Sequence, residues 1–96
     1  MLVLITYDVS TTDADGKRRL RKVAKACVRQ GQRVQNSVFE CSLSPDQLVY
    51  LKQELTQIID QSQDSLRIYN LGNQYRNRIE HIGAKQAYDP DDILII

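Results

Sequence analysis

The sequence predicts an α+β fold of the ferredoxin-like type, an antiparallel sheet with two helices on one of its faces. Strand-like and helix-like segments follow one another in the order β-α-β-β-α-β. Each helical segment carries one apolar stripe, as expected for a helix that packs on one face of a sheet. A length of 96 residues is typical of one domain, so we expect a single domain over residues 1–96.

The first predicted strand, residues 2–9, is almost entirely apolar but carries Asp8 near its C-terminal end. Because a buried carboxylate is costly, Asp8 must be paired, bind a metal or face solvent. Side-chain alternation divides the strand into two faces, Val3, Ile5, Tyr7 and Val9 on one and Leu2, Leu4, Thr6 and Asp8 on the other.

The first helix is predicted over residues 17–30, after a turn at Ser10–Gly16 that offers several N-cap residues. Gly31 is expected to end this helix as its C′ residue. The apolar stripe consists of Leu20, Val23, Ala24, Cys27 and Val28. The basic residues off this stripe are Arg18, Arg21, Lys22, Lys25 and Arg29.

Residues 32–43 are rich in strand-forming residues. They predict either a hairpin, with strands at 32–35 and 38–43, or one long bent strand. The second helix is expected to begin at Pro45, with Ser44 as its N-cap, and to end near Gln61. The last strand of the domain is predicted over residues 64–71.

The C-terminal part is predicted to be irregular over residues 74–88, with a possible short strand at 78–82. It ends in the apolar tail Ile93–Ile96. The face of the sheet without helices is expected to expose four apolar residues, Leu2, Leu4, Leu66 and Ile68. An exposed apolar face and tail favour a homodimer in which residues 74–96 reach the partner's sheet. The alternative is a tail that docks on its own core.

Cys27 and Cys41 show no C-x-x-C spacing and fall at predicted core positions, so we expect free thiols. Free thiols suit the reducing cytoplasm. No apolar run approaches the ~20 residues that span a bilayer, so no membrane partner is expected.

The positive charge is concentrated in one segment. The whole chain has a net charge of only +1, but residues 10–33 contain eight basic and two acidic residues. Exposed Arg and Lys on one helix face can follow a phosphate backbone with little sequence specificity. The predicted nucleic-acid contacts in this segment are Arg18, Arg19, Arg21, Lys22 and Lys25. The alternative is an ordinary solvated helix surface.

Four motifs of this chain resemble one known family. They are LVLITYDV at 2–9, KRRLRKVAK at 17–25, GQRVQNSVFE at 31–40 and DSLRIYNL at 64–71. Together they resemble the small CRISPR-associated adaptation protein family. Its members are the non-integrase partner in the pair that captures new spacers, and they are also described as endoribonucleases.

The resemblance implies a ferredoxin-like homodimer whose C-terminal strand joins the partner's sheet. It implies Mg²⁺ or another divalent cation at Asp8, with Tyr7 beside it in the catalytic site. Further implied site positions are Arg33 and Phe39, together with Arg19 or Arg21, although aromatic residues on strands are more often core. Asn36 departs from the aromatic residue expected in many members.

A single carboxylate holds Mg²⁺ poorly, but Asp8 from each subunit of a dimer would supply two. The metal could then activate water for hydrolysis of a phosphodiester. We therefore expect a metal-dependent endonuclease that binds RNA or double-stranded DNA and acts with the CRISPR integrase in spacer acquisition. The alternative is a non-catalytic dimeric scaffold that bridges integrase subunits and holds duplex DNA. An RNA-recognition or ligand-sensing module is disfavoured, because the strand at 38–43 lacks the Gly-aromatic pattern of RNA-binding sheets.

Overall fold

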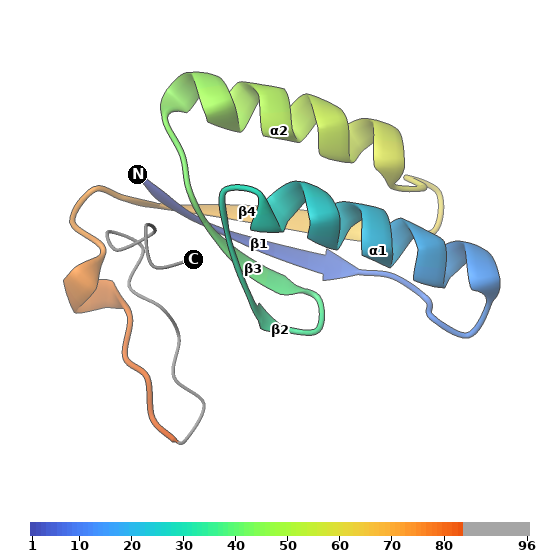
Figure 1. Ribbon diagram of the computed structural model, residues 1–96, viewed down its shortest axis with the longest axis horizontal. Coiled ribbons are helices and arrows are strands. Elements are labelled where there is room, and N and C mark those ends of the chain that lie inside the picture. Colours follow the sequence, from blue (N-terminus) through green and yellow to red (C-terminus); the bar gives the residue numbers. More distant parts are fainter. Residues whose placement is uncertain (84–96) are drawn as a thin grey trace.

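The structure, a computed structural model, describes residues 1–83 of the chain. Its elements are β1 (Leu2–Asp8), α1 (Ala14–Val28), β2 (Gly31–Gln35), β3 (Val38–Ser42), α2 (Pro45–Ile58), β4 (Ser65–Gly72) and the short 3₁₀ helix η1 (Arg76–Arg78). The strands form one antiparallel sheet in the order β2-β3-β1-β4. Both helices lie on one side of this sheet (Figure 1). The ferredoxin-like prediction is confirmed.

The first helix begins three residues earlier than predicted, because Asp13 caps it. The Asp13 carboxylate accepts a hydrogen bond from the backbone N–H of Gly16 at 2.7 Å. At the other end the cap residue is Arg29, and Gly31 opens β2 instead of ending the helix. A side chain at Gly31 would place its Cβ only 1.9 Å from the carbonyl oxygen of Glu40. Gly31 is therefore required by the close approach of β3.

The second helix has the predicted N-terminus. The Ser44 hydroxyl accepts a hydrogen bond from the Gln47 N–H at 3.2 Å, and the Gln47 side chain accepts one from the Ser44 N–H at 2.8 Å. The helix ends at Ile58, earlier than predicted, and a turn built on Asp60 follows. The segment before α2 is the hairpin β2–β3 and not one bent strand.

The core lies between the helices and one face of the sheet. It contains residues from β1, α1, β3 and α2, among them Val3, Ile5, Tyr7, Leu20, Val23, Cys27, Phe39, Cys41, Leu51 and Leu55. Cys27 and Cys41 are buried free thiols, as predicted. The hydrogen bond with Cys41 and burial raise the pKa of the Cys27 thiol.

The register of β4 corrects one prediction. Ile68 lies opposite Ile5 and Leu66 lies opposite Tyr7, so both side chains share the face that the helices cover. Both pack against the core. Leu66 and Ile68 were expected on the uncovered face, but Arg67 and Tyr69 are there instead. The pairing register between β1 and β4 decides which face each side chain of β4 occupies. The sequence of one strand alone does not reveal this register.

A buried carboxylate ties three parts of the fold together. Asp64, just before β4, has a fully buried side chain. It accepts hydrogen bonds from the Tyr7 hydroxyl of β1 and from Arg19 of α1, the latter at 2.8 Å and 3.2 Å. The backbone N–H of Asp60 donates a further bond at 2.9 Å. We call Tyr7, Arg19 and Asp64 the polar clamp.

The polar clamp fixes the charge states of its members. Burial acts to raise the pKa of the Asp64 carboxyl, but hydrogen bonds from Arg19, Tyr7 and the Asp60 backbone outweigh it and hold that pKa below its ordinary value. Burial and the hydrogen bond to Asp64 raise the pKa of Tyr7 to about 12. Asp64 is therefore ionised and Tyr7 neutral near pH 7.

Beyond β4 the chain turns at Gly72, whose φ of 74° favours glycine. η1 and an irregular stretch to Gly83 follow, and residues 78–82 form no strand. The rest of the predicted exchanged segment, including the Ile93–Ile96 tail, lies outside the described residues. Within residues 1–83 no helix has both the length and the apolar character needed to cross a membrane.

Replacement of Asp64 by Asn should lower the free energy of unfolding by about 3 kcal/mol, because it breaks a buried ion pair. Urea unfolding at pH 7 and equal protein concentration would measure this. The matched control is Asp15→Asn, since the Asp15–Arg18 pair is exposed. It should cost less than about 1 kcal/mol. Equal losses in both variants would contradict a stabilising role for the clamp.

The clamp also predicts a pH dependence. Because the folded-state pKa of Asp64 is depressed, its stabilisation is complete above the unfolded pKa of about 4 and is lost as pH falls through the folded pKa. Wild-type stability should therefore drop below about pH 4, and Asp64→Asn should show a shallower drop. Some acid dependence should remain, since hydrogen bonds from Ser62 lower the pKa of Asp60 as well.

Candidate metal site and nucleic-acid interface

Asp8 lies at the C-terminal end of β1, on the face of the sheet that the helices leave open. Its partner across the sheet is Ser65 of β4, and its side chain is exposed. Within residues 1–83 its carboxylate has no hydrogen bond or ion pair. This carboxylate is therefore available to bind a cation.

Asp8 borders a shallow hollow of about 500 Å³ at this edge of the sheet. The residues that line it are Thr6, Tyr7, Asp8, Ser37, Ser65 and Arg67. Arg67 lies opposite Thr6, two positions along the strand pair from Asp8 and Ser65, and therefore on the same face of the sheet. Its guanidinium lies 5.4 Å from the centre of the Tyr69 ring, a cation–π arrangement that orients it. The hollow thus combines a carboxylate for a cation with a guanidinium for a phosphate.

The residues at this hollow fit a Mg²⁺ ion only in part. No group of three or more His, Cys, Asp or Glu side chains among residues 1–83 is placed to hold a metal ion. Mg²⁺ is commonly held by one or two carboxylates, with water and substrate phosphate as the other ligands. Asp8 can supply one of these carboxylates, and it is the only carboxylate among the residues that line the hollow.

Tyr7 does not share the exposed site with Asp8. Neighbouring residues of a strand point to opposite faces, and the Tyr7 side chain is 2% exposed in the core. Its hydroxyl donates to Asp64. The expectation of a catalytic Tyr7 beside Asp8 is therefore replaced by a structural role in the polar clamp.

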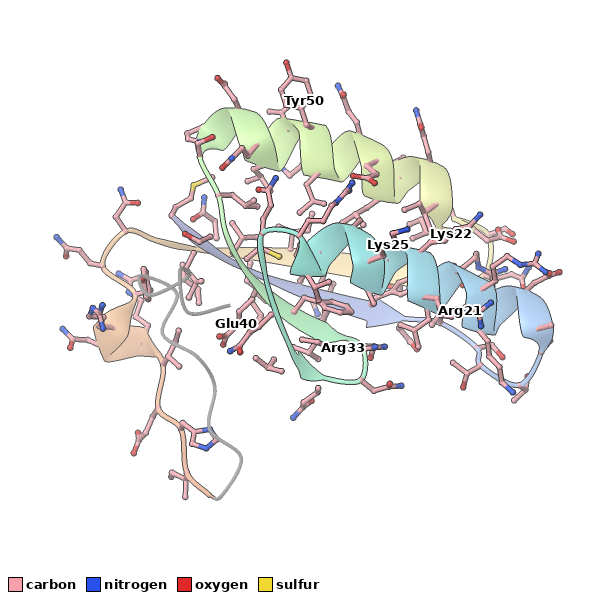
Figure 2. The ribbon with its side chains drawn as sticks, viewed as in Figure 1. Arg21, Lys22, Lys25, Arg33, Glu40 and Tyr50 are labelled. Carbon is pink, nitrogen blue, oxygen red and sulfur yellow. The ribbon has the colours of Figure 1, made fainter. Side chains whose placement is uncertain are left out.

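The basic residues of α1 divide into two groups. Figure 2 shows Arg21, Lys22 and Lys25 projecting from the helix, and all three are exposed. Arg18 is also exposed and forms an ion pair of 3.2 Å with Asp15. Arg19 differs, because its side chain is only 16% exposed and binds Asp64. Arg19 therefore belongs to the clamp and does not form part of the exposed cationic surface, contrary to the prediction.

Arg33 and Phe39 lie opposite each other on β2 and β3. Arg33 is exposed, and its guanidinium lies 5.6 Å from the centre of the Phe39 ring. It also donates a hydrogen bond to the Asn36 carbonyl at 2.7 Å. Phe39 itself is fully buried in the core, so no base can stack on it in this fold. Its predicted nucleic-acid contact is corrected to a packing role beneath Arg33.

The sequence analysis missed Arg67, Ser37 and Ser65 as neighbours of Asp8. Two of them lie in or at the start of β4, and their position follows from the β1–β4 register. Ser37 lies in the β2–β3 turn and comes close because its carbonyl accepts a hydrogen bond from the Tyr7 N–H at 2.9 Å. The sequence analysis placed Leu66 and Ile68 on the uncovered face, and only the β1–β4 register shows that Arg67 and Tyr69 lie there instead.

Comparison with known proteins gives a consistent result over nearly the whole chain. The family model described as "CRISPR associated protein Cas2" matches residues 1–79. A protein of Halalkalibacterium halodurans named CRISPR-associated endonuclease Cas2 is 63% identical over 95 residues, 99% of each chain. A CRISPR-associated endoribonuclease Cas2 of Nitratidesulfovibrio vulgaris is 56% identical over all of this chain and 94% of its own length.

Solved structures agree with these sequence matches. The crystal structure of Streptococcus pyogenes Cas2 is 57% identical, covers 86% of this chain and all of its own, and superposes with a TM-score of 0.80. A chain of a partial Cas6-RT-Cas1–Cas2 complex matches with a TM-score of 0.59 at 29% identity, over 85% of this chain and 90% of its own. The family model, these relatives and the shared fold show that this chain belongs to the CRISPR-associated Cas2 family.

Proposed function

We propose that this chain forms a nucleic-acid-binding homodimer that acts in CRISPR adaptation and hydrolyses phosphodiester bonds with a divalent metal at Asp8. The observation that carries this proposal is the exposed, unpaired Asp8 carboxylate in a hollow that also holds Arg67. The names of the relatives, endonuclease and endoribonuclease, support hydrolysis of nucleic acid. The Cas1–Cas2 complex supports the CRISPR integrase as a partner.

In the proposed mechanism the residues of the chain bind and orient the substrate. Asp8 holds the cation, and Mg²⁺ when bound supplies water activation and neutralises charge on the phosphate. Arg67 donates hydrogen bonds to the non-bridging oxygens of the phosphate that undergoes hydrolysis. The stack on Tyr69 limits the freedom of Arg67, so less entropy is lost on binding.

The open face of the sheet supports the homodimer. It carries Leu4 and Val38 together with Tyr69, which is 41% exposed. Apolar and aromatic groups on an uncovered sheet face favour pairing with a second copy under two-fold symmetry. A second copy would also bring a second Asp8 as a further carboxylate ligand for Mg²⁺.

The substrate in this proposal is held by its backbone. The exposed cations of α1 and Arg33 can neutralise phosphates, whereas the buried Phe39 cannot read a base. Both RNA and double-stranded DNA carry the required phosphates. We therefore propose binding with little sequence specificity.

A second candidate function is a non-catalytic scaffold that bridges integrase subunits and holds duplex DNA. The observation in its favour is that Asp8 is a single carboxylate with no further metal-ligating cluster among residues 1–83. The basic surface of α1 would serve this function unchanged. The two functions are compatible and differ in whether Asp8 is needed.

Asp8→Asn should lower the rate of nucleic-acid cleavage by about 100-fold or more, because it removes the charge that holds the metal. Purified protein with single-stranded RNA and with duplex DNA, with Mg²⁺ and with a chelator, measures this. The control Asp46→Asn, at an exposed carboxylate on α2, should keep the wild-type rate.

Metal-dependent cleavage by Asp8→Asn at the wild-type rate would reject the proposed metal site. If the wild type cleaves neither substrate, and cells that carry Asp8→Ala still acquire spacers, the scaffold is the correct function.

Arg21→Gln should weaken binding to a duplex at low salt and reduce the slope of log Kobs against log[salt] by about one unit, since one phosphate contact is lost. Fluorescence anisotropy over a salt series measures both quantities. Lys52→Gln removes the same charge from the exposed side of α2 and should leave the slope unchanged. Equal changes in both variants would mean that α1 is not the binding surface.

A further inference from the structure

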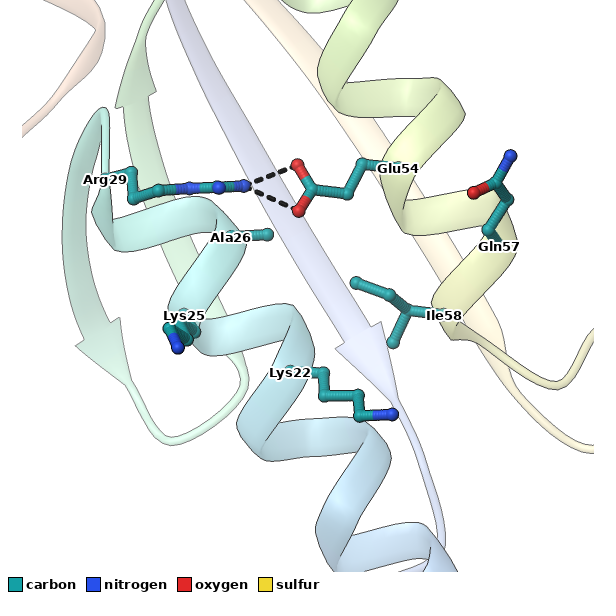
Figure 3. Close-up of a pocket in the computed structure, with 7 residues that line it drawn as sticks. All are labelled: Lys22, Lys25, Ala26, Arg29, Glu54, Gln57 and Ile58. Atoms are coloured by element: carbon teal, nitrogen blue, oxygen red, sulfur yellow. Dashed lines mark hydrogen bonds and ion pairs between the residues drawn. The ribbon is translucent and has the colours of Figure 1, made fainter.

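A groove of about 440 Å³ runs between α1 and α2, on the opposite side of the sheet from Asp8. The residues that line it are Lys22, Lys25, Ala26, Arg29, Glu54, Gln57 and Ile58 (Figure 3). Ala26 is 3% exposed and forms part of the apolar floor. The walls carry three cations from α1 and one carboxylate from α2.

One ion pair spans this groove. The Nη2 atom of Arg29 lies 2.5 Å and 2.6 Å from the two carboxylate oxygens of Glu54. Both side chains are open to solvent, at 57% and 42% exposure. Exposed pairs of this kind contribute little to stability, so Glu54 can be exchanged for another anion at small cost.

The cations on the α1 wall are spaced along the helix. Lys22, Lys25 and Arg29 follow one another at intervals of three and four residues, which places them on one face. Lys22 and Arg29 are two turns apart, about 10 Å along the axis. A strand of B-DNA advances 3.4 Å per nucleotide, so this distance corresponds to about three nucleotides.

We propose that the α1–α2 groove is a binding site for phosphate groups of a nucleic-acid strand. In the free protein Glu54 forms an ion pair with Arg29, and a bound phosphate replaces Glu54 in that pair. Glu54 thus acts as an internal competitor that weakens binding. This inference rests on the proposed function for its ligand. It adds Arg29 and Glu54, which lie outside the predicted contacts.

A chain of phosphates fits this groove better than a lone phosphate ion. Lys22 lies at one end, Arg29 at the other and Lys25 between them, so an isolated ion could meet only part of the set (Figure 3). The groove is also open to solvent, and Arg21 continues the same cationic helix surface beyond it (Figure 2). A bound strand could contact both surfaces at once.

The test is the variant Glu54→Gln, which frees Arg29 and keeps the size of the side chain. Binding of a duplex oligonucleotide at low salt should become about two- to five-fold tighter, the factor by which an exposed ion pair competes. Glu80→Gln makes the same chemical change at an exposed site outside the groove. This control should change the affinity for the duplex much less, because Glu80 does not compete with phosphate for Arg29.

Arg29→Gln should weaken binding, and the double variant Arg29→Gln/Glu54→Gln should lose the gain of Glu54→Gln. The inference is overturned if Glu54→Gln and Glu80→Gln tighten binding equally, or if the gain persists without Arg29. In either case the proposed function would stand, with nucleic acid bound on other surfaces.

A second measurement separates the groove from the proposed function. In NMR spectra, pyrophosphate and a short oligonucleotide should each shift the Arg29 Nε–H signal, the oligonucleotide at lower concentration. If pyrophosphate shifts it but no nucleic acid binds, the groove is an anion site and the proposed function fails. If neither ligand shifts it in wild type or in Glu54→Gln, the groove inference fails. If pyrophosphate binds as tightly as the oligonucleotide, the groove is a site for small phosphates, and the inference of a nucleic-acid strand site is wrong.

Discussion

The buried Asp64 carboxylate is the interaction on which the rest of the structure depends. It receives donors from the central strand, from α1 and from the turn before β4, so it joins elements that are distant in sequence. A buried charge is tolerated only where its partners are complete, and here all of them are present. The arrangement therefore fixes how α1 lies on the sheet and where β4 begins.

The beginning of β4 matters because it sets the register against β1. Ser65 directly follows Asp64 and pairs with Asp8. That register places Arg67 and Tyr69 on the open face and leaves Leu66 and Ile68 for the core. The neighbourhood of Asp8 is thus a consequence of a contact made on the other face of the sheet.

Much of the fold could be predicted from the sequence, because it depends on local patterns. The stripe of α1, the capping residues of α2 and the apolar run of β1 each determine an element without reference to distant residues. The roles of Tyr7, Arg19 and Phe39 could not be predicted in this way. All three carry groups that occur in nucleic-acid sites, and only their burial and their long-range partners show that they stabilise the core. Asp8, Arg21, Lys22 and Lys25 are exposed and have no buried partner within residues 1–83, and their contacts with metal or nucleic acid stay predictions.

β1 carries Tyr7 and Asp8 as neighbours, yet their side chains serve opposite sides of the sheet. The Tyr7 side chain supports the architecture, whereas the Asp8 carboxylate is exposed and has no hydrogen bond or ion pair within residues 1–83. Substitutions at Asp8 should therefore hardly change the free energy of unfolding. Asp8 can then vary without a loss of the fold. Under the proposed function, a single substitution at Asp8 would therefore remove hydrolysis and leave the fold of the subunit intact.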